Sequence, residues 1–316
     1  MGRIQAILVD PNAPARLAVS EAEGPSPAPS EALVRVAAIS LNRGEVNRSQ
    51  AAEGGFNPGW DLAGTVEKAA DDGTGPAEGS RVVGLMSSGA WAELVAVPTV
   101  ALAELPETVS FTDAATLPVA GLTALYALER GGNLLGRTVL VTGASGGAGD
   151  FALRLGSLSG GRIVALVRRT EHEPIAREAG AHEVAVGEGA KAAEGFGPYD
   201  LILDSVGGAV LGEALSMLAP GGSCVAFGGS AAYNVTFDVR DFYLTGGASV
   251  HGFILFHEVL SRPSSAGLAR LASLVADRRL APRIEVEASW TEVGEVARRL
   301  LDRDFTGKAV LHVEGY

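Results

Sequence analysis

The 316-residue chain has little cysteine, no excess of positive charge and no long hydrophobic run. Its single cysteine, Cys224, excludes a disulfide framework and a structural zinc site built from several cysteines. It has 25 Lys and Arg against 37 Asp and Glu, a net charge of −12, whereas nucleic-acid-binding proteins usually present a basic face. We therefore expect no nucleic-acid partner.

Membrane and metal signals are also missing. No stretch of about 18 apolar residues occurs, so no membrane-spanning helix is expected. The opening stretch MGRIQAILVD has neither the long apolar core nor the small-residue cleavage pattern of a signal peptide. The five histidines, at positions 172, 182, 251, 257 and 312, show no metal-ligand spacing. We expect a cytoplasmic protein with no metal and no membrane contact.

The pattern of the chain changes after about residue 110. Before it, short runs such as ALVRVAAISL and SRVVGLM, bounded by Pro, Gly and Asp clusters, predict a mostly antiparallel β-domain. After it, strand-like and helix-like segments alternate from TVLVTG to ASVHGF, which predicts βαβ units and a parallel sheet. Two helical patterns and a final strand, KAVLHVE, follow residue 258.

The clearest motif follows the strand TVLVTG. It reads A-x-G-x-x-G and comprises Ala144, Ser145, Gly146, Gly147 and Gly149. In a strand–turn–helix context such a turn lets the backbone approach a pyrophosphate, lets the helix pack closely, and presents free N–H groups at the helix N-terminus. The pattern predicts a dinucleotide site.

The next strand, RIVALV, ends in Arg168 and Arg169. NAD-binding versions of the motif have an acidic residue near this point, which bonds the ribose 2′-hydroxyl. Guanidinium groups instead bind a 2′-phosphate in bidentate fashion. The predicted cofactor is therefore NADPH, and the alternative is a pair of solvated surface arginines.

Two further turns follow buried strands, where ligands bind in open α/β sheets. The first contains Ser205, Val206 and Gly207, and the second contains Gly228 and Gly229. We predict that both contact the cofactor, with ordinary tight turns as the alternative.

Several segments in order, among them GASGGAG, GSRVVGLMSSGAWAELVAVP, YDLILDSVGG and TGKAVLHV, resemble the zinc-independent medium-chain dehydrogenase/reductases. The branch they resemble most is the NADPH:quinone oxidoreductase group, which includes enoyl reductases. The resemblance implies an α/β fold: a GroES-like, mostly-β catalytic domain (1–118 and 258–316) and a doubly wound Rossmann domain (119–257). It also implies a homodimer paired through sheet edges, for which ASVHGF is the candidate strand.

The resemblance also implies roles for single residues. It implies that Asn42 and Thr123 lie near the nicotinamide and that Phe253 and Ile254 contact its carboxamide. We add Lys308 as a candidate on the cofactor side. Each has a structural alternative: a cap for Asn42, a helix back-bond for Thr123, core packing for Phe253 and Ile254, and a surface lysine for Lys308.

The chain departs from relatives in places that bear on chemistry. Zinc-dependent cousins have a Gly-His-Glu segment where this chain has Gly59-Trp60-Asp61, so no catalytic zinc is expected. Glu45 stands where the family usually has Asp, and Asn47 where it has Tyr, which leaves the proton donor open. Glu45 is interpreted as a cap or salt bridge.

These observations together predict an NADPH-dependent, zinc-free reductase of quinones or α,β-unsaturated carbonyls. One alternative is a specialised biosynthetic tailoring reductase or cyclase. The other is an NADPH-binding, redox-sensing protein with little catalysis.

Overall fold

The computed structural model of the protein describes residues 2–313. The chain forms two compact units. The first contains the chain up to Leu122 and from Val259 onward, and the second is Thr123–Glu258.

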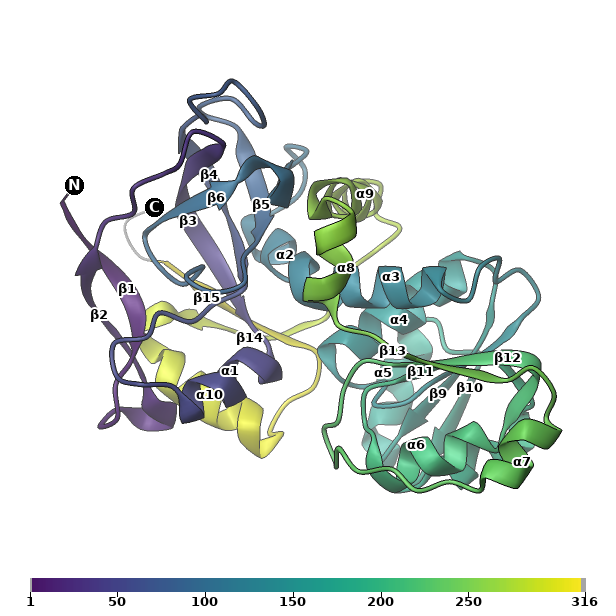
Figure 1. The fold of residues 1–316 in the computed structure, drawn as a ribbon. Helices are drawn as coiled ribbons and strands as arrows, with labels where there is room; N and C mark the ends of the chain where they lie inside the picture. Colours follow the sequence, from purple (N-terminus) through teal and green to yellow (C-terminus); the bar gives the residue numbers. More distant parts are fainter. Residues whose placement is uncertain (1, 314–316) are drawn as a thin grey trace. The chain divides into compact units, whose positions relative to one another are not determined.

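The second unit contains a six-stranded, all-parallel sheet (Figure 1). Its order is β10-β9-β8-β11-β12-β13, which is the Rossmann order 3-2-1-4-5-6 when β8 is counted as strand 1. The strands are β8 (Thr138–Val141), β9 (Arg162–Val167), β10 (Glu183–Val186), β11 (Tyr199–Asp204), β12 (Leu218–Ala226) and β13 (Ser249–Gly252). The predicted Rossmann fold is confirmed.

Helices cover both faces of this sheet (Figure 1). Those that contact its strands are α4 (Gly147–Leu158), α5 (Glu173–Glu178) and α6 (Gly208–Leu215). The unit also contains α7 (Val239–Leu244), and α3 (Leu122–Glu129) and α8 (Leu255–Ser261) lie at its boundaries. Because the central strands are covered on both sides, their middle residues are apolar, as in the LIL run of β11, and β11 is almost completely buried.

The first unit has a seven-stranded, mostly antiparallel sheet in the order β14-β15-β3-β4-β5-β7, with β6 also pairing with β3. The strands are β3 (Glu31–Leu41), β4 (Asp61–Lys68), β5 (Arg81–Leu85), β6 (Leu94–Pro98), β7 (Leu102–Glu104), β14 (Ile284–Ser289) and β15 (Lys308–His312). β1 (Arg3–Val9) and β2 (Leu17–Glu23) form a separate antiparallel pair. The predicted mostly-β domain is confirmed.

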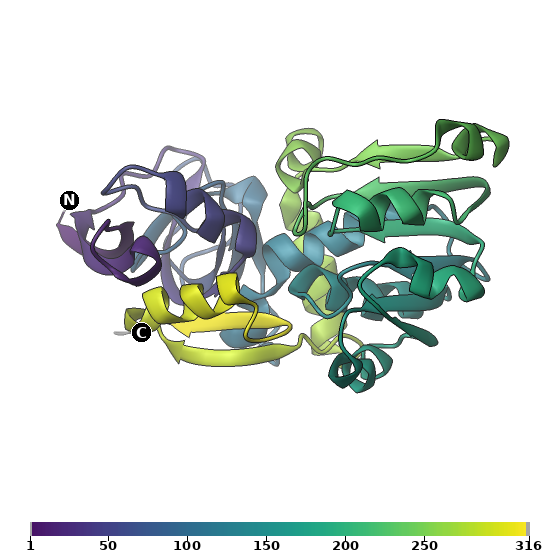
Figure 2. The same ribbon diagram turned by 90° about the horizontal axis from the view of Figure 1, so that it is seen from below.

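Within residues 2–313, the α-helices that lie wholly in this unit are α1 (Arg43–Ala51), α2 (Phe111–Ala115), α9 (Ser264–Ala276) and α10 (Val293–Asp302). The yellow α10 lies alongside α1 in Figure 2, and the two are in contact. Arg43 at the start of α1 donates to the backbone oxygens of Leu300 and Leu301 at the end of α10.

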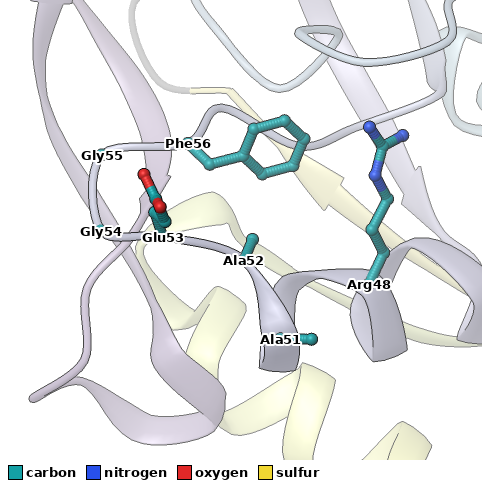
Figure 3. Close-up of a pocket in the computed structure, with 7 residues that line it drawn as sticks. All are labelled: Arg48, Ala51, Ala52, Glu53, Gly54, Gly55 and Phe56. Atoms are coloured by element: carbon teal, nitrogen blue, oxygen red, sulfur yellow. The ribbon is translucent and has the colours of Figure 1, made fainter.

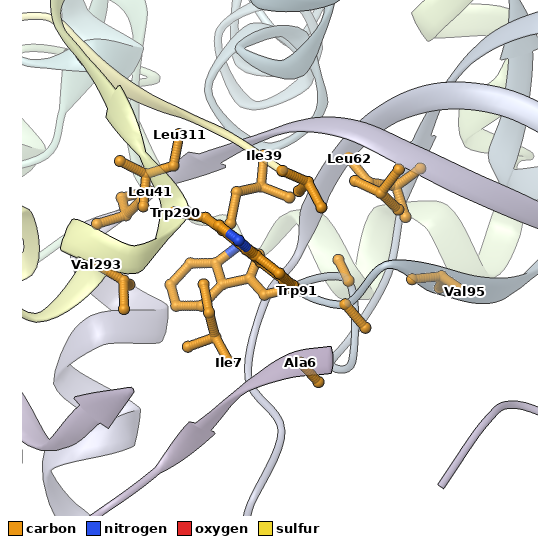
Figure 4. Close-up of a cluster of buried hydrophobic side chains, with 14 of the residues drawn as sticks. Ala6, Ile7, Ile39, Leu41, Leu62, Trp91, Val95, Trp290, Val293 and Leu311 are labelled. Atoms are coloured by element: carbon orange, nitrogen blue, oxygen red, sulfur yellow. The ribbon is translucent and has the colours of Figure 1, made fainter. Parts of the chain in front are cut away.

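The core of this unit packs around two tryptophans, Trp91 and Trp290 (Figure 4). Trp91 is completely buried and lies against Gly59, where an added Cβ would come within 2.5 Å of the indole ring. Trp91 is therefore a core residue. Strand β15 comes from the far end of the chain but pairs with β3, so the two ends of this unit share one sheet.

Among residues 2–313, no helix combines the length and the apolar character needed to cross a bilayer.

Candidate functional site

The glycine motif forms a tight turn between β8 and α4. Gly143 has a φ of +60°, a conformation that favours glycine, and its carbonyl accepts a hydrogen bond from the Gly146 N–H at 3.0 Å. Helix α4 begins at Gly147, and the Asp150 N–H closes its first turn onto the Gly146 carbonyl at 2.8 Å. The first N–H groups of a helix have no acceptor within the helix, so this end of α4 is suited to an anion.

Two glycines of the motif have different surroundings. A Cβ at Gly149 would lie 2.4 Å from the Gly143 oxygen and 2.8 Å from the Ala144 Cα, so only glycine lets α4 pack this closely on the turn. A Cβ at Gly146 would meet a single atom within 4 Å, the Gly143 oxygen at 3.3 Å. The backbone of Gly146 is therefore approachable from outside the protein.

Arg168 and Arg169, the residues predicted to bind the 2′-phosphate, follow the end of β9 and are exposed. The turn after β8 reaches this strand through a bond from the Ala144 N–H to the Leu166 oxygen at 3.3 Å. Arg169 lies 3.8 Å from Glu171 in an exposed ion pair, a weak interaction in water. Within residues 2–313 the Arg168 guanidinium has no hydrogen-bond or ion-pair partner, so it is available to an anion.

The carboxyl ends of β8 and β11 are joined by a buried carboxylate. Asp204 accepts from the Thr142 hydroxyl at 2.6 Å and from the Gly207 N–H at 2.8 Å. Burial raises the pKa of Asp204, while the bonds from Thr142, Gly207 and Val206 oppose the rise. Asp204 thus links the turn at Ser205–Gly207, which is predicted to contact the cofactor, to Thr142 at the end of β8.

The turns at Ser205 and at Gly228 lie together. A Cβ at Gly228 would come within 2.7 Å of the Ser205 oxygen, and Ser205 donates its hydroxyl to the Thr142 oxygen at 3.2 Å. Gly207 has a φ of +71°, and a Cβ there would lie 2.2 Å from the Ala232 oxygen. The structure brings these turns to the carboxyl ends of the parallel strands, where the glycine motif also lies. Their contact with a cofactor stays a prediction.

The remaining candidates of the second unit differ in exposure. Phe253 is buried and its N–H donates to the Ala226 oxygen at 2.9 Å, whereas Ile254 is 55% exposed. Thr123 is buried in the first turn of α3. Phe253 is thus part of the packing, and Ile254 is the member of the pair that a ligand can reach.

In the first unit, Asn42 lies at the centre of a buried polar cluster. Its Nδ2 donates to Asp61 at 2.7 Å and to Glu45 at 3.0 Å, and its Oδ1 accepts from the Lys308 Nζ at 2.6 Å. The Asn42 backbone N–H donates to Glu45 at 2.7 Å, one half of a capping box at the start of α1. The expected cap role of Glu45 is present in the structure.

The charged members of the cluster are almost completely buried: Glu45 is 1%, Asp61 0% and Lys308 3% exposed. Burial, reinforced by the nearby Asp61 carboxylate, raises the pKa of Glu45 well above its ordinary value, against the effect of Lys308. Burial also lowers the pKa of Lys308, while Asp61 and Glu45 oppose the change.

Lys308 is not the surface lysine considered above. Its ammonium contacts three acceptors inside the unit: the Leu41 oxygen at 2.9 Å, Asn42 Oδ1 at 2.6 Å and Asp61 Oδ2 at 3.4 Å. An ammonium has three protons, so these contacts use its donors. A direct contact of Lys308 with a cofactor stays a prediction.

A zinc site does not fit the donors near Asn42. The position of the zinc-ligating histidine is held by Trp60, whose indole N–H only donates, here to the Ser87 oxygen at 3.0 Å. The Asn42 oxygen faces an ammonium group. Within the described part of the chain no cluster of three His, Cys, Asp or Glu side chains could hold a metal ion.

A pocket of about 630 Å³ lies beyond the C-terminal turn of α1 (Figure 3). The Arg48 guanidinium stands over the Phe56 ring at 5.1 Å, and the backbone of Gly55 and Phe56 is bonded to Val9 of β1. The pocket is lined by Arg48, Ala51, Ala52, Glu53, Gly54, Gly55 and Phe56.

Sequence reasoning missed several residues that shape these sites. The sequence analysis predicts no role for Asp61 or Gly143, and it includes Asp204 only as the start of the turn that continues with Ser205. A glycine directly before the motif and a lone acid ending an apolar strand are usable signals. Nothing local to the sequence links Asp61 to Lys308, because 247 positions separate them.

Two family models match the chain. Residues 28–107 match the alcohol dehydrogenase GroES-like domain, and residues 147–272 match the zinc-binding dehydrogenase domain. The human synaptic vesicle membrane protein VAT-1 homolog-like is 28% identical over 92% of this chain and 76% of its own length. The bovine quinone oxidoreductase-like protein 2 is 28% identical over 82% of this chain and 77% of its own length.

Among solved structures, a mycobacterial protein complexed with NADPH superposes with a TM-score of 0.87 at 25% identity, over 98% of this chain and 99% of that one. The order of the Rossmann sheet, the glycine turn and the GroES-like unit agree with both family models. The chain therefore belongs to the medium-chain dehydrogenase/reductase superfamily, in its quinone oxidoreductase-like branch of oxidoreductases.

Proposed function

We propose that this oxidoreductase uses NADPH to reduce quinones or α,β-unsaturated carbonyls without zinc. The observation that carries the proposal is the approachable backbone of Gly146 at the start of α4, together with the unpaired Arg168 cation after the next strand. The similar mycobacterial structure is described as complexed with NADPH, which supports the same choice.

The residues of the second unit fit such a cofactor. The N–H groups at the start of α4 would bind the pyrophosphate, and Arg168, with Arg169 beside it, would bind the 2′-phosphate. The cofactor would also contact the turns at the carboxyl ends of β11 and β12, which contain Ser205, Val206, Gly207, Gly228 and Gly229. When bound, the cofactor supplies the hydride.

A zinc-free reaction is supported by the chemistry of the donors. Trp60 cannot ligate a metal, and the Asn42 oxygen is already bonded to Lys308. Without a Lewis acid to polarise an isolated carbonyl, a conjugated acceptor is the suitable substrate, because its own π-system takes up the electron density of the hydride. The relative named as quinone oxidoreductase-like is consistent with this class.

A second copy of the chain completes the proposed assembly. β13 is the edge strand of the Rossmann sheet, and large apolar side chains are exposed on and near it. They include Val250 on the strand, Tyr243 and Leu244 on α7, and Tyr233 before it. Pairing of two edge strands would satisfy the free backbone groups and cover these side chains.

Turnover assays test the proposal. Purified protein should oxidise NADPH in the presence of simple quinones or enones, and with NADH in place of NADPH the rate should be much lower. NADPH binding without turnover of quinones or enones would instead favour the redox-sensing alternative or a specialised tailoring enzyme. No NADPH binding in calorimetry would refute the proposal.

A further inference from the structure

The orientation of the Asn42 amide is determined by its neighbours. The Lys308 ammonium only donates, so the atom 2.6 Å from it is the amide oxygen. The Asp61 carboxylate accepts, so the atom 2.7 Å from it is the amide nitrogen. Both N–H bonds of Nδ2 are used, by Asp61 and by Glu45. Oδ1 accepts from Lys308 and, in the capping box, from the Glu45 backbone N–H, so the neighbours of Asn42 fix its amide in one orientation.

The cluster contains one buried cation and two buried carboxyl groups. Asp61 accepts from the Ser40 hydroxyl at 2.6 Å, from Asn42 and from Lys308, and its other oxygen accepts from the Val119 N–H at 2.9 Å. Four donors stabilise an ionised carboxylate. Of the two carboxyl groups, Asp61 is the one in contact with the Lys308 ammonium.

The second carboxyl group, Glu45, is bonded on one side only. Its Oε1 accepts both the backbone and the side-chain N–H of Asn42, whereas its Oε2 is buried and has no partner among the described residues. An ionised Oε2 without a donor would be costly at this depth. A neutral carboxyl group avoids this cost because it carries no buried charge, and its proton belongs on Oε2 because Oε1 faces two N–H donors.

We propose that Glu45 is a neutral carboxylic acid in the folded protein, and that Glu45 and Lys308 are positioning residues that fix the orientation of the Asn42 amide. The charged and titratable groups that face Glu45 are Asp61 on β4 and Lys308 on β15, with the Asn42 amide at the start of α1. The effect on catalysis rests on the proposed function, whereas the protonation state of Glu45 does not.

The variant Glu45→Gln tests whether Glu45 is neutral or ionised. Glutamine keeps the shape of the glutamate side chain and its accepting oxygen, but it does not titrate. The pKa of Glu45 is raised above 4.5 by burial, so between the unfolded and the folded pKa the folded protein holds one more proton than the unfolded chain. The stability that Glu45 contributes is therefore complete below the unfolded pKa and is lost as the pH rises.

In urea titrations from about pH 5 to about pH 8, the folding equilibrium constant of the wild type should fall relative to that of E45Q by about tenfold per pH unit until the folded pKa is reached. Parallel curves would mean that Glu45 is ionised and would overturn the proposal. Carbon-13 NMR of the wild type with labelled glutamate carboxyls needs no variant. One resonance should keep the position of a protonated acid at neutral pH, and its absence would also overturn the proposal.

Lys308→Met tests the positioning role. It removes the donor to Asn42 Oδ1, so the rate of single-turnover hydride transfer should fall by about tenfold or more. The Kd for NADPH should stay within about twofold, since every acceptor of Lys308 lies in the first unit. A loss of NADPH affinity with an unchanged rate would show that Lys308 contacts the cofactor instead. Because the urea and NMR measurements need no substrate, they decide the state of Glu45 even if quinones and enones are not turned over.

Discussion

Arg168 and Arg169 are adjacent in sequence but differ in what surrounds them. Arg169 has an acidic neighbour, Glu171, at 3.8 Å, while the Arg168 guanidinium has no partner within residues 2–313. An unpaired cation loses no existing interaction when it binds a phosphate. Arg168 is therefore the residue on which the choice between NADPH and NADH should depend most.

Arg168→Ala should weaken NADPH binding by about 10- to 100-fold and leave NADH binding nearly unchanged, because a charge-assisted bond to the 2′-phosphate contributes about 1.5–3 kcal/mol. Isothermal titration with both cofactors measures this. Arg177→Ala is the matched control, since Arg177 is an exposed arginine on α5 that pairs with Glu173. An equal loss for NADPH and NADH would refute the assignment.

Short helices and turns of this protein are specified by different signals. Helix α4 follows a strand and a glycine turn, so its position is clear from the sequence. Helix α1 is polar, and its main signal is the Asn42–Glu45 capping box. β14 has the alternating sequence IEVEAS but is absent from the elements predicted from the sequence, and it pairs in parallel with β15 at the edge of a mostly antiparallel sheet.

The packing of α4 against its turn depends on Gly149. Gly149→Ala should destabilise the second unit by about 1–3 kcal/mol and reduce dinucleotide affinity, because its Cβ would meet backbone atoms that cannot yield easily. Gly195→Ala is the control: a Cβ there meets nothing within 4 Å, so the change should stay within about 0.5 kcal/mol. Chemical denaturation followed by circular dichroism compares the two, and equal stability would contradict the packing argument.

For the molecule as a whole, the outer edge of the Rossmann sheet is formed by β13, which pairs only with β12 among the described residues. The Phe253 N–H bonds back to β12, so by alternation the Val250 N–H points to the free edge of β13. A second copy would find a backbone donor and an exposed apolar side chain at the same residue.

Val250→Pro should shift the protein from dimer to monomer, because proline removes the outward N–H without removing a bond to β12. Sedimentation equilibrium measures the change. Val250→Ala keeps the N–H and serves as the control, with a smaller effect that comes only from lost apolar area. A wild-type protein that is monomeric at micromolar concentration would disprove the edge-pairing proposal.

The Rossmann unit was predictable because its signals are local. Buried strands are apolar, helices follow at regular intervals, and the glycine turn lies within a few residues of the strand and helix that it joins. The position of Arg168 and Arg169 was also predictable, because they directly follow the next strand along the chain. The local sequence also contained the Asn42–Glu45 cap.

The charge balance of the cluster was decided only by the tertiary structure. Asn42 and Lys308 are 266 positions apart and meet because β15 returns to pair with β3. Burial then removes the water that would otherwise solvate three charges, so one carboxyl group is left without a countercharge. The sequence shows that an acid, an amide and a lysine exist, but their protonation and hydrogen-bonding roles follow only from the sheet that encloses them.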